Sequence, residues 1–411
     1  LHIGDNIQSD IEQSKKNGWG TQRCKNVAPL KFLYNLSEMS YLSRSIYTGL
    51  INSFFYNSIE SRSLYYEYGF TCGGILVWSI CQWLEKLRKT EDIDKFLFLA
   101  RDCEIISEIY NKYFDTSVGK YIWFSRCASE KLILNEWFEE YIVQAIRVEF
   151  VYGNELKTIG ELLSFCGLEC ICSKLQKYEV CCNDLRKDVG YEKFKKILYD
   201  NKTLIIEQFS ESQKIAERYL RAEISGSKKI CVVDSCWRGS SIVFLKQLIE
   251  KKYQIPAAVQ GVLIISDNTE YSEGFKFADI IKQYSNVNLN DKLLKMSKNV
   301  KKRAAFELLF SSEHPSLLQF TSKNDYQISE SSFIYAATNP DAYKSKEIQK
   351  GISDFCNFYY SIFGDLSYKL HFSSLDAFTP IMNRLNDISF VEELINGSNL
   401  NFGFRHGNEK K

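Results

Sequence analysis

The sequence predicts an α/β protein built on a mostly parallel β-sheet. Two strand–loop–helix units carry this prediction, residues 96–113 and residues 230–250, and in each a short apolar run leads through polar residues into helical spacing. Two further apolar runs, 121–124 and 259–265, alternate with helical segments. Because strands that alternate with helices are typical of parallel sheets, we expect ligands to bind at the carboxyl ends of these strands.

The unit at residues 230–250 organises the chain. Its apolar run ends at Asp234, and small residues separate this strand from the helix. The loop contains Arg238, Gly239, Ser240 and Ser241. A loop of this kind aims backbone N–H groups and the positive end of the helix dipole at one point, where a phosphate can approach. Asp234 could hold sugar hydroxyls or Mg²⁺ beside it, although a Gly/Ser turn after a buried strand is also ordinary architecture.

The unit at residues 96–113 places a charge pair between an apolar strand and an apolar helix. Arg101 and Asp102 stand at this junction, where a charge is unfavourable unless it is paired or functional. The planar fork of Arg101 suits a pyrophosphate, but an Arg–Asp salt bridge that caps the helix is an equal alternative. Arg126 follows the next strand, so it also falls at a strand end.

Composition narrows the class of protein. The 411 residues carry a net charge of +1, which gives no electrostatic reason to expect nucleic acid or anionic lipid as the main partner. The 13 cysteines are scattered, many of them in apolar runs, and we see no secretory signal, so we expect reduced thiols in the cytoplasm. The most apolar stretch, residues 72–84, is too short to span a bilayer.

We expect four regions along the chain: an N-terminal segment, a helical linker, an α/β domain interrupted by a helical insert at residues 130–222, and a mainly helical C-terminal region. Their limits are residues 1–30, 31–90, 91–290 and 291–411. Five cysteines between Cys166 and Cys182 lie in the insert, where zinc is conceivable although the spacing fits no zinc knuckle or ribbon. His314 precedes a proline and is either a general base or a turn residue.

The first twenty residues hold a second acidic motif. A strand ends at Gly4 and Asp5, Asp10 begins a helix, and Gly18 closes it. Two carboxylates so placed can share a hard cation, and the alternative is an N-cap and a turn. The segment resembles the last motif of haloacid dehalogenase (HAD) phosphatases, which implies that Asp5 and Asp10 help to hold magnesium.

The other HAD motifs, namely the aspartyl nucleophile, the Ser/Thr motif and the lysine, are absent from this chain. We therefore do not expect it to hydrolyse phosphate by that route. Because the chain begins on a motif, we expect it to be the C-terminal part of a longer protein.

Two short runs resemble the C-terminal module of bacterial proteins that join a HAD phosphatase to a polysaccharide-assembly glycosyltransferase. The first is Phe98-Leu99-Ala100-Arg101-Asp102, with Cys103 in place of the family glycine. The second is the Asp-x-x-Trp-x-Gly pattern, present as Asp234 to Gly239. This resemblance implies a role in bacterial surface polysaccharide biosynthesis, in the cytoplasm or at the inner face of the membrane.

The same two units are similar to type I phosphoribosyltransferases, which use phosphoribosyl pyrophosphate (PRPP). That similarity implies a Rossmann-like domain in which Arg101 faces pyrophosphate, Asp234 the ribose hydroxyls, and Gly239–Ser241 the 5-phosphate. Ser235 replaces the second acid of the family pattern, the loop is shorter by a residue, and Asp102 and Cys103 replace two glycines. These departures leave the chemistry to be tested.

Together the resemblances imply Mg²⁺- and PRPP-dependent phosphoribosyl transfer to a glycan acceptor, paired with HAD-type removal of the 5-phosphate. In this hypothesis Asp234, Arg101 and Asp102 are catalytic. The substrate-binding residues are Arg126, Arg238, Gly239, Ser240 and Ser241. Two alternatives stay open: a HAD phosphatase whose C-terminal region is a cap, or a non-catalytic scaffold that docks a glycosyltransferase.

Overall fold

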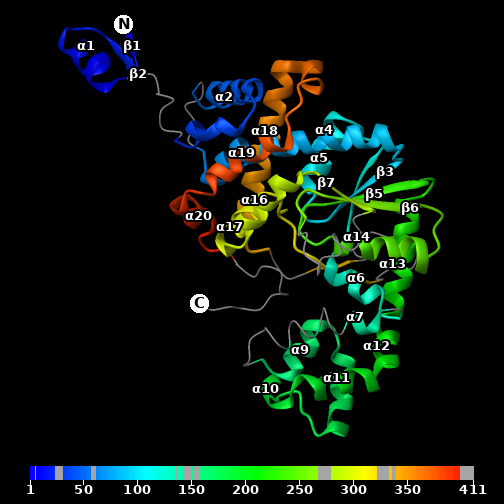
Figure 1. The fold of residues 1–411 in the computed structure, drawn as a ribbon. Helices are drawn as coiled ribbons and strands as arrows, with labels where there is room; N and C mark the ends of the chain where they lie inside the picture. Colours follow the sequence, from blue (N-terminus) through cyan, green and yellow to red (C-terminus); the bar gives the residue numbers. More distant parts are fainter. Residues whose placement is uncertain are drawn as a thin grey trace.

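The computed structural model of the protein describes residues 1–4, 6–23, 31–56, 62–135, 137–141, 146, 150, 157–266, 279–321, 333–335 and 339–398. Its centre is a five-stranded sheet in the order β4-β3-β5-β6-β7 (Figure 1). The strands are β3 (Lys95–Leu99), β4 (Gly119–Ile122), β5 (Lys229–Asp234), β6 (Ala258–Leu263) and β7 (Ile281–Gln283). Every pair of neighbouring strands in this five-stranded sheet is parallel, so the predicted α/β architecture with a mostly parallel sheet is confirmed.

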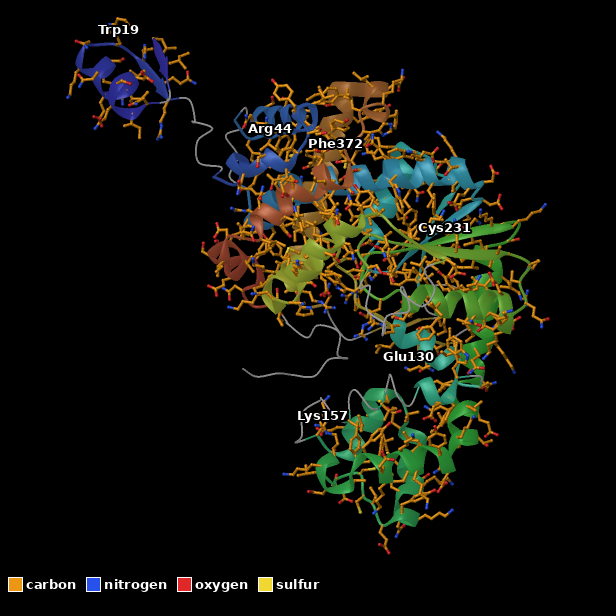
Figure 2. The ribbon with its side chains drawn as sticks, viewed as in Figure 1. Trp19, Arg44, Glu130, Lys157, Cys231 and Phe372 are labelled. Atoms are coloured by element: carbon orange, nitrogen blue, oxygen red, sulfur yellow. The ribbon has the colours of Figure 1, made fainter. Side chains whose placement is uncertain are left out.

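The central strands are buried on both faces, which explains why their sequences are almost continuously apolar. Successive side chains of β3 and β5 belong alternately to two hydrophobic clusters, as strand geometry requires. One cluster contains Phe96, Phe98, Cys231 and Val233, and the other contains Leu97, Leu99, Ile230 and Val232. Figure 2 labels Cys231 within the sheet.

Helices cover both faces of the sheet. The first cluster is completed by α4 (Gly74–Glu91) and α5 (Glu104–Tyr113), and the second by α6 (Arg126–Leu132), α13 (Ser210–Glu223) and α14 (Ser240–Lys246). Helix α14 continues directly into η6 (Gln247–Lys252). Figure 1 shows α4 and α5 on one side of the sheet and α13, α14 and α6 on the other.

The strand order contains one reversal. Numbered by their place in the chain, the five strands run 2-1-3-4-5 across the sheet, so the order turns back between β3 and β5. In open α/β sheets a crevice forms at the carboxyl ends of the two strands that flank such a reversal, and ligands bind there. The topology therefore singles out the ends of β3 and β5.

A helical layer packs beside the sheet and combines two separate parts of the chain. Its early elements are η2 (Lys31–Glu38), α2 (Tyr41–Tyr56), α3 (Leu64–Tyr68) and η3 (Gly69–Gly73). Its late elements are α16 (Val287–Ser297), α17 (Val300–Leu308), α18 (Ala342–Phe363), η8 (Gly364–Tyr368), α19 (Ser374–Arg384) and α20 (Ile388–Ile395). Both parts share the hydrophobic cluster that also contains one face of β3 and β5.

Glycines let α18 approach η3 closely. A Cβ on Gly351 would lie 2.3 Å from the carbonyl oxygen of Tyr66, and one on Gly69 would lie on the carbonyl of Ile348. Asp376 adds a polar tie between the early and late parts, because its carboxylate accepts from the Ser40 amide at 2.7 Å. The residues expected to form a linker and a C-terminal region are therefore packed into one layer.

The insert has a hydrophobic cluster of its own. Its elements are α7 (Phe138–Tyr141), α9 (Ile159–Cys166), η5 (Glu169–Tyr178), α10 (Arg186–Val189), α11 (Tyr191–Asp200) and α12 (Lys202–Gln208). Helix α9 begins with a capping box formed by Thr158 and Glu161. In Figure 1 the insert extends from the sheet beyond α6.

The N-terminal segment is a small separate unit. It consists of the parallel pair β1 (His2–Gly4) and β2 (Thr21–Arg23) with η1 (Ile7–Glu12) and α1 (Gln13–Lys16) between them. Among residues 1–4 and 6–23 no side chain is fully buried, and Trp19 is 58% exposed. Figures 1 and 2 show this unit standing apart from the remaining elements.

Three details differ from the sequence prediction. The second strand of the sheet lies at 119–122 and not at 121–124, because its pairing with β3 begins at Gly119. Strand β7 lies where no apolar run was identified, and the antiparallel pair β8 (Leu317–Phe320) and β9 (Phe333–Tyr335) lies in the region expected to be mainly helical. None of the helices in the described part of the chain has both the length and the apolar character needed to cross a membrane.

Candidate active site at the carboxyl edge of the sheet

The two acids singled out by the sequence meet at the strand reversal. Asp234 is the last residue of β5, and Asp102 follows β3, whose Phe98 pairs with Val233 of β5. Asp234 is only 9% exposed, and Asp102 is half-buried. The hydroxyl of Ser235 donates to Oδ2 of Asp102 at 3.5 Å, a long hydrogen bond that links the two loops.

Burial and proximity both favour the protonated form of these acids. Burial, and to a smaller extent the nearby Asp102 carboxylate, raise the pKa of Asp234 to about 7 against the opposing charge of Arg126. Burial likewise raises the pKa of Asp102, while Arg101 and Arg126 act in the opposite direction. Near neutral pH this corner therefore favours an added cation or hydrogen-bond donors from a ligand.

Arginines stand on the β3 and β4 sides of the acidic pair. Arg101 is half-buried, and among the described residues its guanidinium donates to the Ser316 hydroxyl at 2.9 Å, not to Asp102. The alternative of an Arg–Asp salt bridge that caps the helix is therefore not seen among the described residues. Arg126 is exposed at the start of α6, and its charge acts on both Asp102 and Asp234.

The loop after Asp234 turns tightly into α14. Gly239 occupies the N-cap with φ = 75°, a left-handed conformation that a residue with a Cβ adopts only with strain. Ser240 and Ser241 are buried at the first two helical positions, whereas Arg238 is exposed. The loop thus enters α14 through a left-handed turn at Gly239, and its role as an anion cradle stays a prediction.

Helix α17 holds this loop in place. The Trp237 indole donates to Oε1 of Glu307 at 2.7 Å, and Arg303 bonds the same oxygen at 2.9 Å. The Arg303 guanidinium also lies 5.1 Å from the centre of the Trp237 ring. Glu307 adds a negative charge near the acidic pair, which contributes to the raised pKa of Asp102.

A segment distant in sequence reaches the same edge. Besides the contact of Ser316 with Arg101, the hydroxyl of Ser125 donates to the Leu317 carbonyl at 2.6 Å. His314 lies in this segment, 18% exposed, with its Nε2 hydrogen-bonded to the Tyr121 hydroxyl and its ring 4.4 Å from that of Trp123. Residues 314–317 therefore pack against the ends of β3 and β4.

Sequence reasoning missed three contributors to this site: Tyr121, Glu307 and Ser316. Tyr121 lies within an expected strand, where alternation could have placed it on one face. No local signal marks Glu307 or Ser316, because their role depends on contacts with loops 70 and 215 residues away in the chain.

The N-terminal acids form a different arrangement. Asp5 lies outside the described residues, so the expected pairing with Asp10 is not visible. The Asp10 carboxylate accepts from the Asn6 amide and the Ser9 hydroxyl, each at 3.0 Å, and lies 3.6 Å from His2 Nε2. The Asn6 hydrogen bond is the main reason for the lowered pKa of Asp10. This is the turn-closing geometry of the alternative interpretation.

Few side chains of this corner could hold a magnesium ion. Within the described residues no group of three or more His, Cys, Asp or Glu side chains is placed to hold a metal. Asp102 and Asp234 could together supply two oxygen ligands. Because Mg²⁺ is commonly bound by one or two carboxylates plus substrate phosphates and water, the acidic pair fits an ion that arrives with a phosphorylated ligand.

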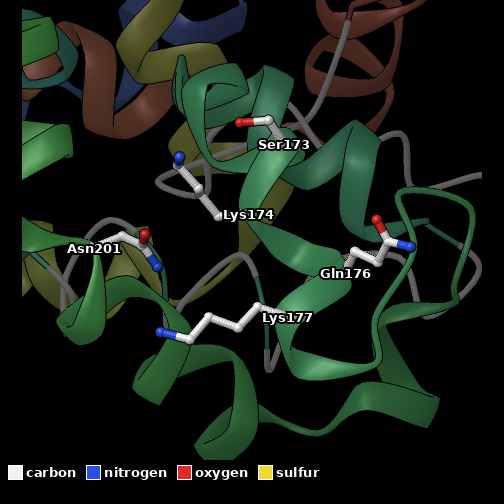
Figure 3. A pocket seen from close by; sticks show the side chains of 5 residues that line it. All are labelled: Ser173, Lys174, Gln176, Lys177 and Asn201. Atoms are coloured by element: carbon white, nitrogen blue, oxygen red, sulfur yellow. The ribbon is translucent and has the colours of Figure 1, made fainter.

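The insert offers a weaker candidate. A depression there is lined by Ser173, Lys174, Gln176, Lys177 and Asn201 (Figure 3). It lies in the helical insert, away from the acidic pair, and its lining comes from surface side chains of η5 and the α11–α12 junction. Of the cysteines nearby, Cys166 is buried and Cys172 and Cys182 are half-buried. We therefore take the carboxyl edge as the site.

Comparison with known proteins adds no identification. No protein-family model matches the chain, and no curated protein matches it significantly.

Proposed function

We propose that the carboxyl edge of β3 and β5 binds PRPP with Mg²⁺ and transfers its phosphoribosyl group to a hydroxyl of a glycan acceptor. The observation that carries the proposal is the meeting of Asp102 and Asp234 at the strand reversal, beside Arg101 and Arg126 and next to the Gly239 turn. A diphosphorylated pentose needs this combination: oxygen acceptors for hydroxyls, cations for pyrophosphate, and a backbone turn for the 5-phosphate.

The charge of each site residue indicates which part of PRPP it would bind. Arg101 and Arg126 are suited to the pyrophosphate, since a guanidinium can donate two parallel hydrogen bonds to phosphate oxygens. Asp234 is suited to the ribose hydroxyls, and the backbone of Gly239–Ser241 to the terminal phosphate. Mg²⁺ bound together with the donor would neutralise phosphate charge near Asp102 and Asp234.

Transfer needs no nucleophile on the protein. As pyrophosphate leaves with the electron pair of its bond to ribosyl C1, the charge that develops on its oxygens is stabilised by fixed arginines. The site contributes by holding donor and acceptor in line, which converts a bimolecular reaction into an effectively unimolecular one. The glycan acceptor, a partner glycosyltransferase and a cytoplasmic setting belong to the same proposal.

Calorimetric titration of PRPP, with and without Mg²⁺, tests the proposal. We expect the wild-type protein to bind only with Mg²⁺, and Arg101→Ala and Asp234→Asn to abolish binding. Asp188→Asn, an exposed acid of α10 in the insert, is the matched control and should bind as the wild type does. Folded wild-type protein that binds no PRPP would refute the proposal.

Proton release provides a second measurement on the same samples. If Mg²⁺ and the donor engage Asp234, they must displace the proton that its raised pKa of about 7 retains. We therefore expect proton release on binding at pH 6 and much less at pH 8.5, measured in buffers of different ionisation enthalpy. Binding without any pH-dependent proton release would show that Asp234 does not contact the ligand.

A further inference from the structure

Phosphoribosyl transfer to a hydroxyl needs a proton acceptor. The segment around His314 contains one that is separate from the arginines and acids of the site. An acceptor hydroxyl must lose a proton as its oxygen attacks C1. The aspartates of the site stand with Arg101 and Arg126 where the donor would bind, so a separate proton acceptor is expected on the acceptor side. His314 and Tyr121 lie next to this corner, on the side of edge strand β4.

The hydrogen bonds of His314 determine its tautomer. Nδ1 lies 3.1 Å from the carbonyl oxygen of Pro315, which can only accept, so Nδ1 carries the proton. Nε2 is then an acceptor, and the Tyr121 hydroxyl donates to it. This leaves the lone pairs of the tyrosine oxygen available to accept a proton from a bound hydroxyl.

The surroundings keep His314 neutral and hold it in place. Burial lowers its pKa below the ordinary value of 6.5, and the charge of Arg101 acts in the same direction. The charges that oppose this shift are Asp102 and Glu313, and Glu104 Oε1 of α5 lies 3.8 Å from Nε2. These carboxylates would stabilise an imidazolium once it forms. The Trp123 ring packs against the imidazole.

We propose that Tyr121 and His314 form a proton relay that deprotonates the acceptor hydroxyl, an inference that rests on the proposed function. The acceptor O–H bond breaks as its oxygen bonds to ribosyl C1, and the bond from C1 to pyrophosphate breaks with its electrons on pyrophosphate. The proton of the acceptor passes to the Tyr121 oxygen, and the tyrosine proton passes to Nε2 of His314. The acceptor therefore binds on the β4 side of the acidic pair.

His314→Gln and Tyr121→Phe test the relay, with PRPP and Mg²⁺ as the donor and water or molar methanol as the acceptor. Glutamine keeps an acceptor for the Tyr121 hydroxyl but cannot take up a proton, so a merely structural histidine would tolerate it. The matched control is His371→Gln, at an exposed histidine between η8 and α19. Circular dichroism verifies folding, calorimetry gives the PRPP affinity, and pyrophosphate release gives the rate.

We expect both variants to bind PRPP within about threefold of the wild type. Pyrophosphate release should fall about 100-fold or more in His314→Gln, since general-base catalysis contributes roughly 10²- to 10⁴-fold. At saturating PRPP and Mg²⁺, where the ionisation of Asp234 no longer limits donor binding, the wild-type rate should decline as pH falls through the pKa of His314, and this acid limb should be missing in His314→Gln. His371→Gln should keep the wild-type rate and pH profile.

Wild-type rates in both variants, or an unchanged acid limb in His314→Gln, would overturn the relay while leaving the donor site intact. A wild-type protein that binds PRPP but releases no pyrophosphate to either acceptor would also overturn it. Failure of the wild type to bind PRPP is a separate result, because it removes the proposed function and the relay with it.

Discussion

The chain contains two acidic corners that look alike in sequence and differ in structure. In each, a short strand is followed by aspartates and then by a helix. At the carboxyl edge of the sheet, Asp234 is 9% exposed and its pKa is raised. In the N-terminal unit, Asp10 is partly exposed, bonded to the Asn6 amide, and its pKa is lowered. The comparison teaches that acids at similar spacing can differ in burial and in the direction of their pKa shift, which acid spacing alone does not reveal.

The largest expected effect is on ligand binding. Asp102→Asn should weaken PRPP binding with Mg²⁺ by 100-fold or more, about 3 kcal/mol, because it removes the negative charge of one of the two carboxylates of the acidic pair. Asp10→Asn should leave the affinity unchanged, since its carboxylate closes a turn in the separate unit. Calorimetry measures the PRPP affinity of both variants. Equal affinities would show that the Asp102 corner is no more important for binding than the Asp10 corner.

The next effect is on stability and its dependence on pH. The folded-state pKa of Asp234 lies near 7 against 3.8 unfolded, so its ionisation opposes folding as pH rises through this range. Asp234→Asn should therefore stabilise the protein without ligand by on the order of 4 kcal/mol at pH 8 and by almost nothing at pH 4. Urea unfolding of variant and wild type measures the difference.

Asp10 should show the opposite sign. Because its pKa is lowered in the folded state, its stabilisation is present above pH 3.8 and is lost as pH falls through the lowered value. A stabilising effect of Asp234→Asn that did not vary with pH would point to packing, not to the ionisation of the carboxylate.

Adding a methyl group to a glycine should reduce stability in the tightly packed helical layer and not in the N-terminal unit. Gly351→Ala should destabilise the protein by about 1–3 kcal/mol, because its Cβ would meet the Tyr66 carbonyl oxygen at 2.3 Å and the Phe70 nitrogen at 2.7 Å. Gly20→Ala is the control, since the nearest atom to its Cβ is 3.8 Å away on Leu1. Denaturant midpoints of the two variants should differ accordingly, and a neutral Gly351→Ala would contradict the close contact.

The smallest effect is expected from deleting residues 1–23. These residues bury no side chain fully among those described, so their loss should shift the melting temperature of the remaining chain by less than about 2 °C. PRPP affinity should also be unaffected. A drop of many degrees would mean that the N-terminal unit supports the sheet domain.

The sequence predicted the site best where local pattern and strand topology agree. The apolar runs at 96–99 and 230–233 fixed two parallel strands, and parallel strands bring their carboxyl ends to one edge. That is why Asp102 and Asp234 could be expected together. For Arg101 the sequence left two interpretations open. The described residues show its guanidinium bonded to the Ser316 hydroxyl and not to Asp102, so the salt-bridge alternative is not seen, and the phosphate-binding role stays a prediction.

By itself, the sequence determined the parallel α/β class, the main strands and helices, and the polar residues at the strand ends. These follow from periodicity and burial, which are properties of a few consecutive residues. The tertiary structure alone decided that β3 and β5 flank the strand reversal, that α17 holds the Trp237 loop, and that His314 reaches Tyr121. Such contacts join residues far apart in the chain, so they depend on how whole layers pack and leave no trace in local spacing.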